Sequence, residues 1–229
     1  MLPILNSVPK YNLVVPSTGK KVRYRPYLVK EEKILLMANE SKDPDQVLDS
    51  IIDTIRACTD NKLKLSELTS FDIEYMFIKL RAKSVGETIT LHLPCTECEK
   101  RTETTMSLDD VECPVDKNHD MIIKLDDSIS VEMKYPGYKI TVAETKQDAA
   151  VHAMAQCISA VISDDERIDV EDETTESVQA FLESMTRTQF EQITQFVLNI
   201  PQVQYTIEFE CEHCSEHNEV EVKGLQNFF

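Results

Sequence analysis

Residues 91–98 read Leu-His-Leu-Pro-Cys-Thr-Glu-Cys, and residues 207–214 read Ile-Glu-Phe-Glu-Cys-Glu-His-Cys. In each stretch, apolar and polar residues alternate as in a β-strand and run into a Cys-x-x-Cys pair. The two pairs lie 116 residues apart. Four thiolates brought together make a closed tetrahedral zinc site, which holds structure instead of performing chemistry. We therefore predict one structural zinc ion per chain in a zinc-ribbon-like site, with four ligands: Cys95, Cys98, Cys211 and Cys214.

Other interpretations of the cysteine pairs stay open on the sequence alone. Glu99 and Ser215 stand where a glycine usually follows the second cysteine, and that turn often needs a residue with positive φ. His213 and His217 are alternative ligands, which we interpret as surface histidines because four thiolates are available. The alternative to a metal site is that the two pairs are reduced surface thiols. No thioredoxin-like βαβ pattern surrounds either pair, which argues against a redox-active site.

The remaining cysteines and the absence of targeting signals indicate a reducing compartment. Seven cysteines are an odd number, unlike the even set of a secreted disulfide framework. The N-terminal residues show no signal-peptide pattern, and no stretch approaches the roughly 20 apolar residues of a membrane span. Cys58 and Cys157 follow helical apolar stripes and are expected to be small buried hydrophobes, whereas Cys113 lies in a polar stretch and is a candidate exposed thiol.

The charge is unevenly placed along the chain. The net charge is −17, but residues 1–36 carry seven Lys and Arg against two Glu, which leaves −22 on the rest. So acidic a body repels phosphate backbones, which argues against general nucleic-acid binding. Within the run Lys20–Arg25, basic residues alternate with Val22 and Tyr24. This pattern is typical of an edge strand with a cationic face. It either neutralises the acidic body, docks an acidic partner or protects the edge from aggregation.

The sequence contains no pattern that indicates an enzyme. It has no Walker loop, nucleophile elbow or His-Glu-x-x-His motif. Adjacent carboxylates in acidic stretches usually keep a surface solvated, and no convergent His or Lys supports acid–base catalysis. We interpret three such pairs as solvated loops: Asp126/Asp127, Asp164/Asp165 and Asp172/Glu173.

Periodicity predicts an α+β fold made of two related halves. Caps and apolar stripes predict helices over residues 30–40, from 44, from 69 or 70, over 149–162, and over 177–200 with a break near 185–188. Alternation predicts strands over residues 11–15, 21–28, 89–93, 102–108, 122–125, 129–133 and 138–142, with 164–176 as an acidic loop.

The order of these elements predicts an internal repeat. Helix, loop, helix, strand, Cys-x-x-Cys and strand occur once in residues 44–108 and again in 149–223. We therefore expect an N-terminal half, 1–108, and a C-terminal half, 109–229, each a helical pair feeding a β-hairpin. The zinc site would join the two halves into one compact body.

One family resemblance is carried by residues 20–100. Residues 27–40, residues 71–87 with the run Leu-Arg-Ala-Lys-Ser-Val-Gly at 80–86, and the first cysteine pair are similar to the T4-type bacteriophage baseplate hub subunit or hub-assembly protein family. The resemblance implies a late, non-enzymatic viral protein that contacts other hub or tail proteins. It would act in the host cytoplasm during assembly, as a factor that leaves or as a subunit that stays in the virion.

Two rival functions belong to other classes. A zinc-ribbon nucleic-acid-binding regulator would need cationic residues around the cysteines, but glutamates predominate there. A metalloenzyme would need water as one zinc ligand in place of a thiolate.

Overall fold

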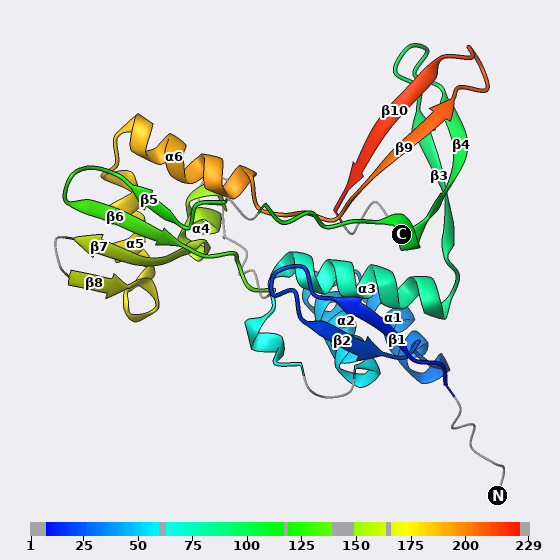
Figure 1. The fold of residues 1–229 in the computed structure, drawn as a ribbon, viewed down its shortest axis with the longest axis horizontal. Coiled ribbons are helices and arrows are strands. Elements are labelled where there is room, and N and C mark those ends of the chain that lie inside the picture. Colours follow the sequence, from blue (N-terminus) through cyan, green and yellow to red (C-terminus); the bar gives the residue numbers. More distant parts are fainter. Residues whose placement is uncertain (1–7, 60–62, 117–118, 139–148, 164–165, 225–229) are drawn as a thin grey trace, which may run out of the picture. The chain divides into compact units, whose positions relative to one another are not determined.

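The computed structural model describes residues 8–59, 63–116, 119–138, 149–163 and 166–224 (Figure 1). They divide into two units, one built from the chain up to Val115 and from Gln202 onward, the other from Asp116–Pro201. These units differ from the halves expected at residue 108, because the later cysteine hairpin belongs to the first unit. The second unit is therefore inserted within the first.

The first unit opens with a β-hairpin and three helices. The hairpin pairs β1 (Tyr11–Val14) with β2 (Lys21–Tyr24). The helices that follow are α1 (Val29–Ser41), α2 (Pro44–Cys58) and α3 (Ser70–Ser84), with a short 3-10 turn, η1 (Leu65–Glu67), between the last two. The predicted helix starts are confirmed by the caps that cause them, since Asp43 accepts from the N–H groups of the first turn of α2 and Thr69 forms a capping box with Asp72.

Asp72 also anchors the β1–β2 turn to α3. Its carboxylate is fully buried and accepts from the Ser17 N–H at 2.9 Å, the Ser17 hydroxyl at 2.5 Å and the Thr69 N–H at 3.0 Å. A buried carboxylate needs such partners to offset its desolvation. One side chain therefore both caps the helix and fixes the turn that precedes β2.

Two cysteine hairpins complete the first unit. The first pairs β3 (Thr88–Pro94) with β4 (Arg101–Ser107), and the second pairs β9 (Gln204–Glu210) with β10 (His217–Lys223). Their apolar faces meet in one core with one side of α3, where the buried residues are Ile78, Ala82, Met106, Leu108, Val111, Val203, Ile207, Phe209 and Val222. A two-stranded hairpin is marginal alone, so each hairpin depends on the other.

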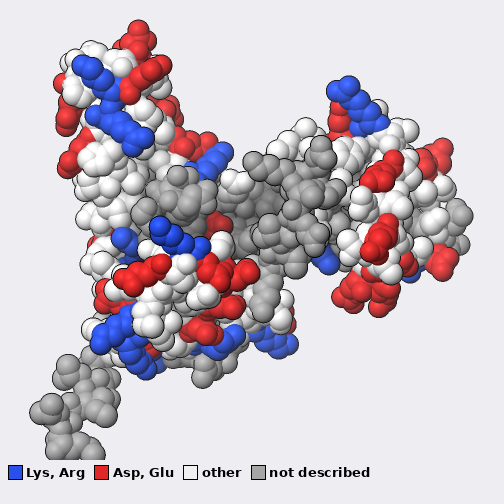
Figure 2. All heavy atoms as spheres, turned by 180° about the vertical axis from the view of Figure 1, so that it is seen from behind, with Lys and Arg blue, Asp and Glu red and all other residues white. Residues whose placement is uncertain are grey.

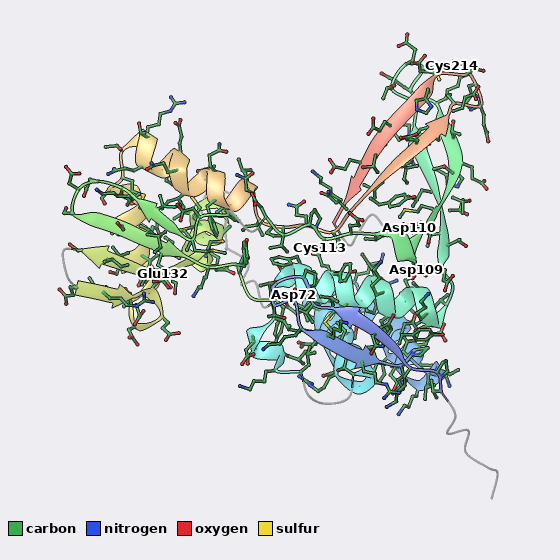
Figure 3. All side chains as sticks on the ribbon, in the orientation of Figure 1. Asp72, Asp109, Asp110, Cys113, Glu132 and Cys214 are labelled. Carbon is green, nitrogen blue, oxygen red and sulfur yellow. The ribbon has the colours of Figure 1, made fainter. Side chains whose placement is uncertain are left out.

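Lysines on α3 bind the chain that leaves β4. Lys83 Nζ lies 2.5 Å from Glu87 and 2.6 Å from Asp109, and Lys79 Nζ contacts the carbonyls of Leu108 and Asp109. Asp109 belongs to η2 (Leu108–Asp110) and is labelled beside α3 in Figure 3. The basic end of α3 therefore has a structural role: it ties the helix to the first cysteine hairpin and opposes the helix dipole.

The second unit is a four-stranded antiparallel sheet with three helices. The strand order is β5 (Ile122–Lys124), β6 (Ile129–Met133), β7 (Ile158–Ser163) and β8 (Glu166–Asp169). The helices are α4 (Ala149–Gln156), α5 (Thr175–Glu183) and α6 (Arg187–Leu198), and η3 (Val170–Asp172) is a 3-10 turn. The core between sheet and helices contains Val131, Met133, Met154, Cys157, Ile158, Leu182, Ile193 and Phe196.

Two sequence predictions in this unit are wrong. The predicted helix over 149–162 ends at Gln156, and Ile158–Ser163 is a strand instead, because its β-branched residues fill the central position between β6 and β8. The predicted loop over 164–176 contains β8, which is the edge strand of the same sheet, the 3-10 turn η3 and the start of α5. Most of the predicted strand over 138–142 lies outside the described residues.

The α+β class is confirmed. The described residues contain six α-helices and small antiparallel sheets, and the break expected near 185–188 separates α5 from α6. In the described part of the chain, no helix has the length and apolar character needed to cross a bilayer.

Candidate metal centre

Each cysteine pair lies in a tight turn, here called a knuckle, at the end of its hairpin. In the first knuckle the Cys95 N–H donates to the Lys100 carbonyl at 2.9 Å, and the Glu99 N–H donates to the Cys95 carbonyl at 3.0 Å. In the second knuckle the Cys211 N–H donates to Glu216 at 2.8 Å, and the Ser215 N–H donates to Cys211 at 2.9 Å. The two turns have the same hydrogen-bond pattern.

The residues in the glycine positions adopt the glycine conformation. Glu99 and Ser215 both have a φ of 59°. This left-handed conformation is rare for residues with a side chain, because Cβ crowds the following carbonyl. The knuckle geometry is therefore kept although neither turn contains the usual glycine.

The structure brings all four predicted cysteines together. The Cys95 and Cys214 sulfurs lie 3.6 Å apart, as do those of Cys98 and Cys211, and all four lie within 4.8 Å of one another. A tetrahedral zinc ion with Zn–S bonds of about 2.3 Å would hold its sulfurs about 3.8 Å apart. The residues of this four-cysteine cluster fit a tetrahedral metal ion with small adjustments.

Peptide groups of the knuckles stabilise two of the sulfurs as thiolates. The Glu97 N–H points at Cys95 Sγ and the His213 N–H points at Cys211 Sγ, each at 3.4 Å. Hydrogen bonds from the backbone of Cys98 and Glu97 lower the pKa of Cys95. Those from His213 and Cys214 lower the pKa of Cys211 to about 6. Thiolates are the form in which cysteine binds a metal.

The pKa of Cys214 shows that the four sulfurs cannot all be thiolates without a nearby positive charge. The backbone N–H of Glu216 favours its thiolate, but partial loss of solvent around this exposed residue and hydrogen bonds with the three neighbouring sulfurs outweigh that bond and raise the pKa of Cys214 to about 12. Four thiolates at these distances repel one another unless a positive charge lies between them. A bound metal ion would supply that charge, and the cluster would release protons on binding it.

Two polar side chains cross between the hairpins to reach the sulfurs. Thr102 of β4 donates its hydroxyl to Cys211 Sγ at 3.7 Å, and Asn218 of β10 donates its amide to Cys95 Sγ at 3.6 Å. Both side chains are buried, and the Asn218 carbonyl oxygen also accepts from Thr96 N–H at 2.8 Å. Such partners orient metal ligands and tune their basicity.

The sequence analysis missed Thr102 and Asn218, although a signal was present. Each stands four residues after the second cysteine of its own hairpin, at an inward strand position where alternation favours an apolar residue. A buried polar residue near ligands is the usual mark of an outer-shell partner.

The structure places the other candidate residues away from the sulfurs or in structural roles. His213 and His217 are exposed, and the metal-binding group found among the described residues includes neither. Cys58 and Cys157 are buried as predicted, whereas Cys113, the candidate exposed thiol, is partly buried against the hairpin core. Asp126 caps the β5–β6 turn by accepting from Ser128 and Ile129.

The other carboxylate pairs have no described link to the cluster. Asp172 ends the 3-10 turn η3 of the second unit, and Asp164 and Asp165 lie outside the described residues. Chemically, the four-cysteine cluster can hold an ion and thereby fix the two hairpins to each other. A site closed by four thiolates leaves no position for a substrate.

Comparison with known proteins places the chain in a viral context. A family model described as T4 bacteriophage base plate protein matches residues 8–229, nearly the whole chain. No curated protein and no solved structure matches it.

Proposed function

The chain belongs to the T4 bacteriophage base plate protein family, and from that membership we propose that it acts in assembly of the central hub of a contractile-tail baseplate, through protein–protein contacts and without enzymatic chemistry. The family match over residues 8–229 is the observation that carries this proposal. The partners are other hub or tail proteins, met in the host cytoplasm during assembly.

Exposed apolar side chains on α1 support contact with a protein partner. On α1, Val29 is 66% exposed, Leu36 58% and Met37 70%, although this helix buries little apolar surface of its own. A group of large apolar side chains left in water marks an interaction surface more often than chance. We propose that this face of α1 contacts another baseplate protein.

The four-cysteine cluster supports a structural zinc ion. Four thiolates in tetrahedral arrangement select soft, tetrahedral metals, of which zinc is the common structural ion. Elemental analysis of the purified protein should find about one zinc per chain. Zero or two per chain would contradict a site shared by both cysteine pairs.

The matching hairpins support an internal duplication of the chain. Thr88 pairs with Ser107 as Gln204 pairs with Lys223, and Thr102 and Asn218 occupy equivalent positions. The helix before each hairpin starts at a capping threonine, Thr69 or Thr186. We infer that zinc lies between two related halves.

The electrostatics of the cluster favour a protein partner over a nucleic acid. Six exposed glutamates surround the knuckles, against Lys100 and Arg101; they are Glu97, Glu99, Glu208, Glu210, Glu212 and Glu216. On the face drawn in Figure 2, acidic and basic side chains are interspersed and no broad basic patch is visible. Binding of duplex DNA at moderate salt would contradict this proposal.

Mass spectrometry of purified virions tests the proposal and distinguishes its two forms, a resident subunit and an assembly factor. Presence at a fixed stoichiometry identifies a resident subunit. Absence from virions, together with unassembled hubs when the protein is missing, identifies an assembly factor. Absence together with normal hubs made without the protein would contradict both forms.

Variants of α1 test the contact surface. Leu36→Glu with Met37→Glu should abolish co-purification with hub proteins, whereas Leu198→Glu, at an equally exposed position on α6, should not. If both variants behave alike, the face of α1 is not the contact.

A further inference from the structure

The outer face of α1 carries a group of apolar side chains that lie in water. Val29, Ile34, Leu36 and Met37 are all exposed. Every other helix or strand in the described part of the chain exposes at most one large apolar side chain. Groups of this kind mark surfaces that another molecule covers.

Charged residues alternate with apolar ones along this face. Val29, Lys33, Leu36 and Glu40 follow one another at steps of four, three and four residues, so they lie in one row along the helix, with Met37 beside it. Lys33 and Glu40 are exposed, and neither forms an ion pair or a side-chain hydrogen bond with another described residue. The row therefore offers one charge of each sign beside its apolar residues.

The two charges are placed symmetrically about the centre of the row. Lys33 precedes Leu36 by three residues, and Glu40 follows Met37 by three. When two copies of α1 lie antiparallel about a two-fold axis at this centre, Lys33 of each copy lies level with Glu40 of the other. Leu36 and Met37 of both copies then pack around the axis. A parallel pair would instead place like charges beside each other, which repulsion disfavours.

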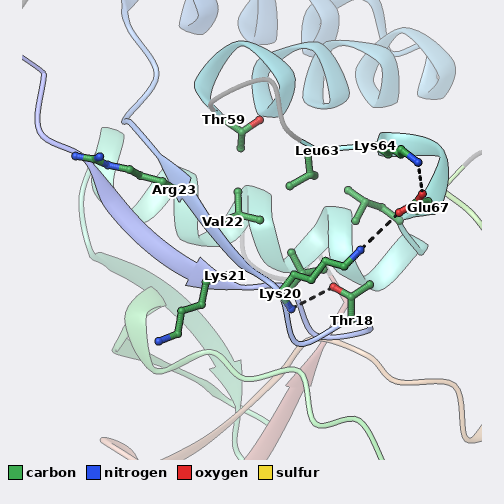
Figure 4. Close-up of a pocket in the computed structure, with 11 residues that line it drawn as sticks. Thr18, Lys20, Lys21, Val22, Arg23, Thr59, Leu63, Lys64 and Glu67 are labelled. Atoms are coloured by element: carbon green, nitrogen blue, oxygen red, sulfur yellow. Dashed lines mark hydrogen bonds and ion pairs between the residues drawn. The ribbon is translucent and has the colours of Figure 1, made fainter.

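The face of α1 differs from the hollow on the same unit. That hollow, of about 540 Å³, lies between β2 and η1, and α1 contributes none of the residues that line it (Figure 4). Its rim charges are paired with one another, since Lys20 and Lys64 contact Glu67 at 3.8 Å and 3.1 Å. The row on α1 is instead a convex helix surface, whose shape suits packing against another helix.

The length of α1 limits how tightly a second copy can bind. The helix has 13 residues, which corresponds to about 20 Å. A contact along one such helix buries less than the roughly 1,600 Å² of a standard stable interface. A dimer formed through α1 is therefore weak and reversible, and a partner with a larger interface can replace the second copy.

We propose that a second copy of the chain covers this face of α1, with the two helices antiparallel, until a baseplate partner takes its place. The replacement rests on the proposed contact of α1 with a baseplate protein, whereas the dimer itself does not. Lys33 of each copy pairs with Glu40 of the other, and the apolar residues between them leave water. Self-association thus protects the contact surface before assembly.

Sedimentation equilibrium of the purified full chain tests the dimer. The unmodified protein should pass reversibly from monomer to dimer as its concentration rises. Leu36→Glu should abolish the dimer, whereas Leu198→Glu, an equally exposed position on α6, should not. Monomer at every concentration, or equal effects of the two variants, would overturn the proposal.

Charge variants test the antiparallel arrangement. Lys33→Glu or Glu40→Lys alone places like charges opposite each other twice, and should weaken dimerisation about tenfold or more. A mixture of these two variants should form mixed dimers, because both ion pairs are then restored. Lys124→Glu, an equal charge change in the second unit, should leave dimerisation unchanged. Circular dichroism checks that each variant keeps its helices.

The mixing experiment also contains the result that would refute this geometry. Preferred pairing of Lys33→Glu with the unmodified chain, instead of with Glu40→Lys, would indicate parallel helices. Monomeric protein whose co-purification with hub proteins still needs Leu36 and Met37 would refute the dimer alone. A dimer that needs these residues, with co-purification that does not, would support the dimer and contradict the proposed contact with hub proteins.

Discussion

At the scale of single residues, Glu99 and Ser215 show that the knuckle geometry outweighs local preference. Each holds a left-handed backbone without being glycine. The conformation costs about 1–2 kcal/mol for a residue with a side chain. The surrounding hydrogen bonds and the packed hairpins therefore impose it.

Replacement of either residue by glycine should stabilise the protein. For Glu99→Gly and Ser215→Gly we expect a gain of roughly 0.5–1 kcal/mol each, since glycine relieves the strain but loses more entropy on folding. Urea unfolding measures the change. Glu97→Gly is the matched control, because Glu97 lies in the same turn without a positive φ, and should destabilise. A loss of stability for all three would contradict the role of strain.

The crossing contacts of Thr102 and Asn218 should matter for metal affinity. Thr102→Val and Asn218→Leu each remove a hydrogen bond to a sulfur of the other hairpin, and we expect zinc affinity to fall by about 10–100-fold. Competition with a chelating dye measures this. Thr104→Val, the same change two residues along β4, should have little effect. Equal affinities in all variants would mean that the contacts are only structural.

Buried thiols predict a loss of stability at alkaline pH. Burial raises the pKa of Cys58 and of Cys157 to about 11, from the ordinary value of 9.0. The folded state keeps these protons while the unfolded state releases them, so their contribution is complete below pH 9 and is lost as pH rises toward 11.

Removal of these thiols should flatten that dependence. Cys58→Ala with Cys157→Ala should lower the free energy of unfolding at neutral pH but reduce its decline between pH 9 and 11. Ile55→Val, which removes a buried methyl group without removing a thiol, should keep the full decline. Denaturant unfolding at several pH values, under reducing conditions, distinguishes the two slopes.

At the scale of elements, the two cysteine hairpins are the parts that would depend most on a bound metal ion. Each is a separate two-stranded sheet whose inner face is covered by the other. Such hairpins are marginal alone, whereas α2 and α3 contain none of the four cysteines of the cluster.

Chelation should therefore loosen the hairpins selectively. Hydrogen exchange should accelerate at residues 205–223 and at 88–107 when zinc is removed, with smaller changes in α2 and α3. Unchanged exchange at 205–223 would count against a structural metal at the tips.

The sequence predicted elements well where local signals and tertiary environment agreed. Asp43, Thr69 and the residues before each cysteine pair gave correct starts of helices and strands. The prediction for the stretch around Ile158 was wrong, because its apolar spacing fits a helix while its β-branched residues fit a central strand. The sheet partners that decide between the two are distant in sequence. The four cysteines were found from spacing, but Thr102 and Asn218 required knowledge of which hairpin faces which.

At the scale of the whole molecule, the second unit is an insertion between two parts of the first. The chain leaves the first unit after Val115 and returns at Gln202. Near this point the outgoing and returning segments pair, since Glu112 and Gln204 exchange N–H to C=O bonds of 3.0 Å and 2.8 Å. The first unit therefore already holds the two segments side by side.

Excision of the insertion should leave the first unit folded. Replacement of residues 116–201 by a short Gly-Ser linker should give a protein that unfolds cooperatively and binds one zinc ion. Residues 116–201 alone should fold without a metal, around their own core. Circular dichroism, unfolding curves and elemental analysis test both pieces. Failure of the shortened chain to bind zinc would show that the cluster needs the second unit.

The pairing of residues 95–98 with 211–214 has a consequence for synthesis on the ribosome. The first knuckle emerges while its partner is still unmade, and translation of the intervening insertion takes on the order of 10 s. During that interval the nascent chain offers two thiols and one uncovered hairpin face, while the insertion can already fold. The first unit can complete its folding only after the later hairpin has been synthesised. Its completion is therefore one of the last events in the synthesis and folding of the chain.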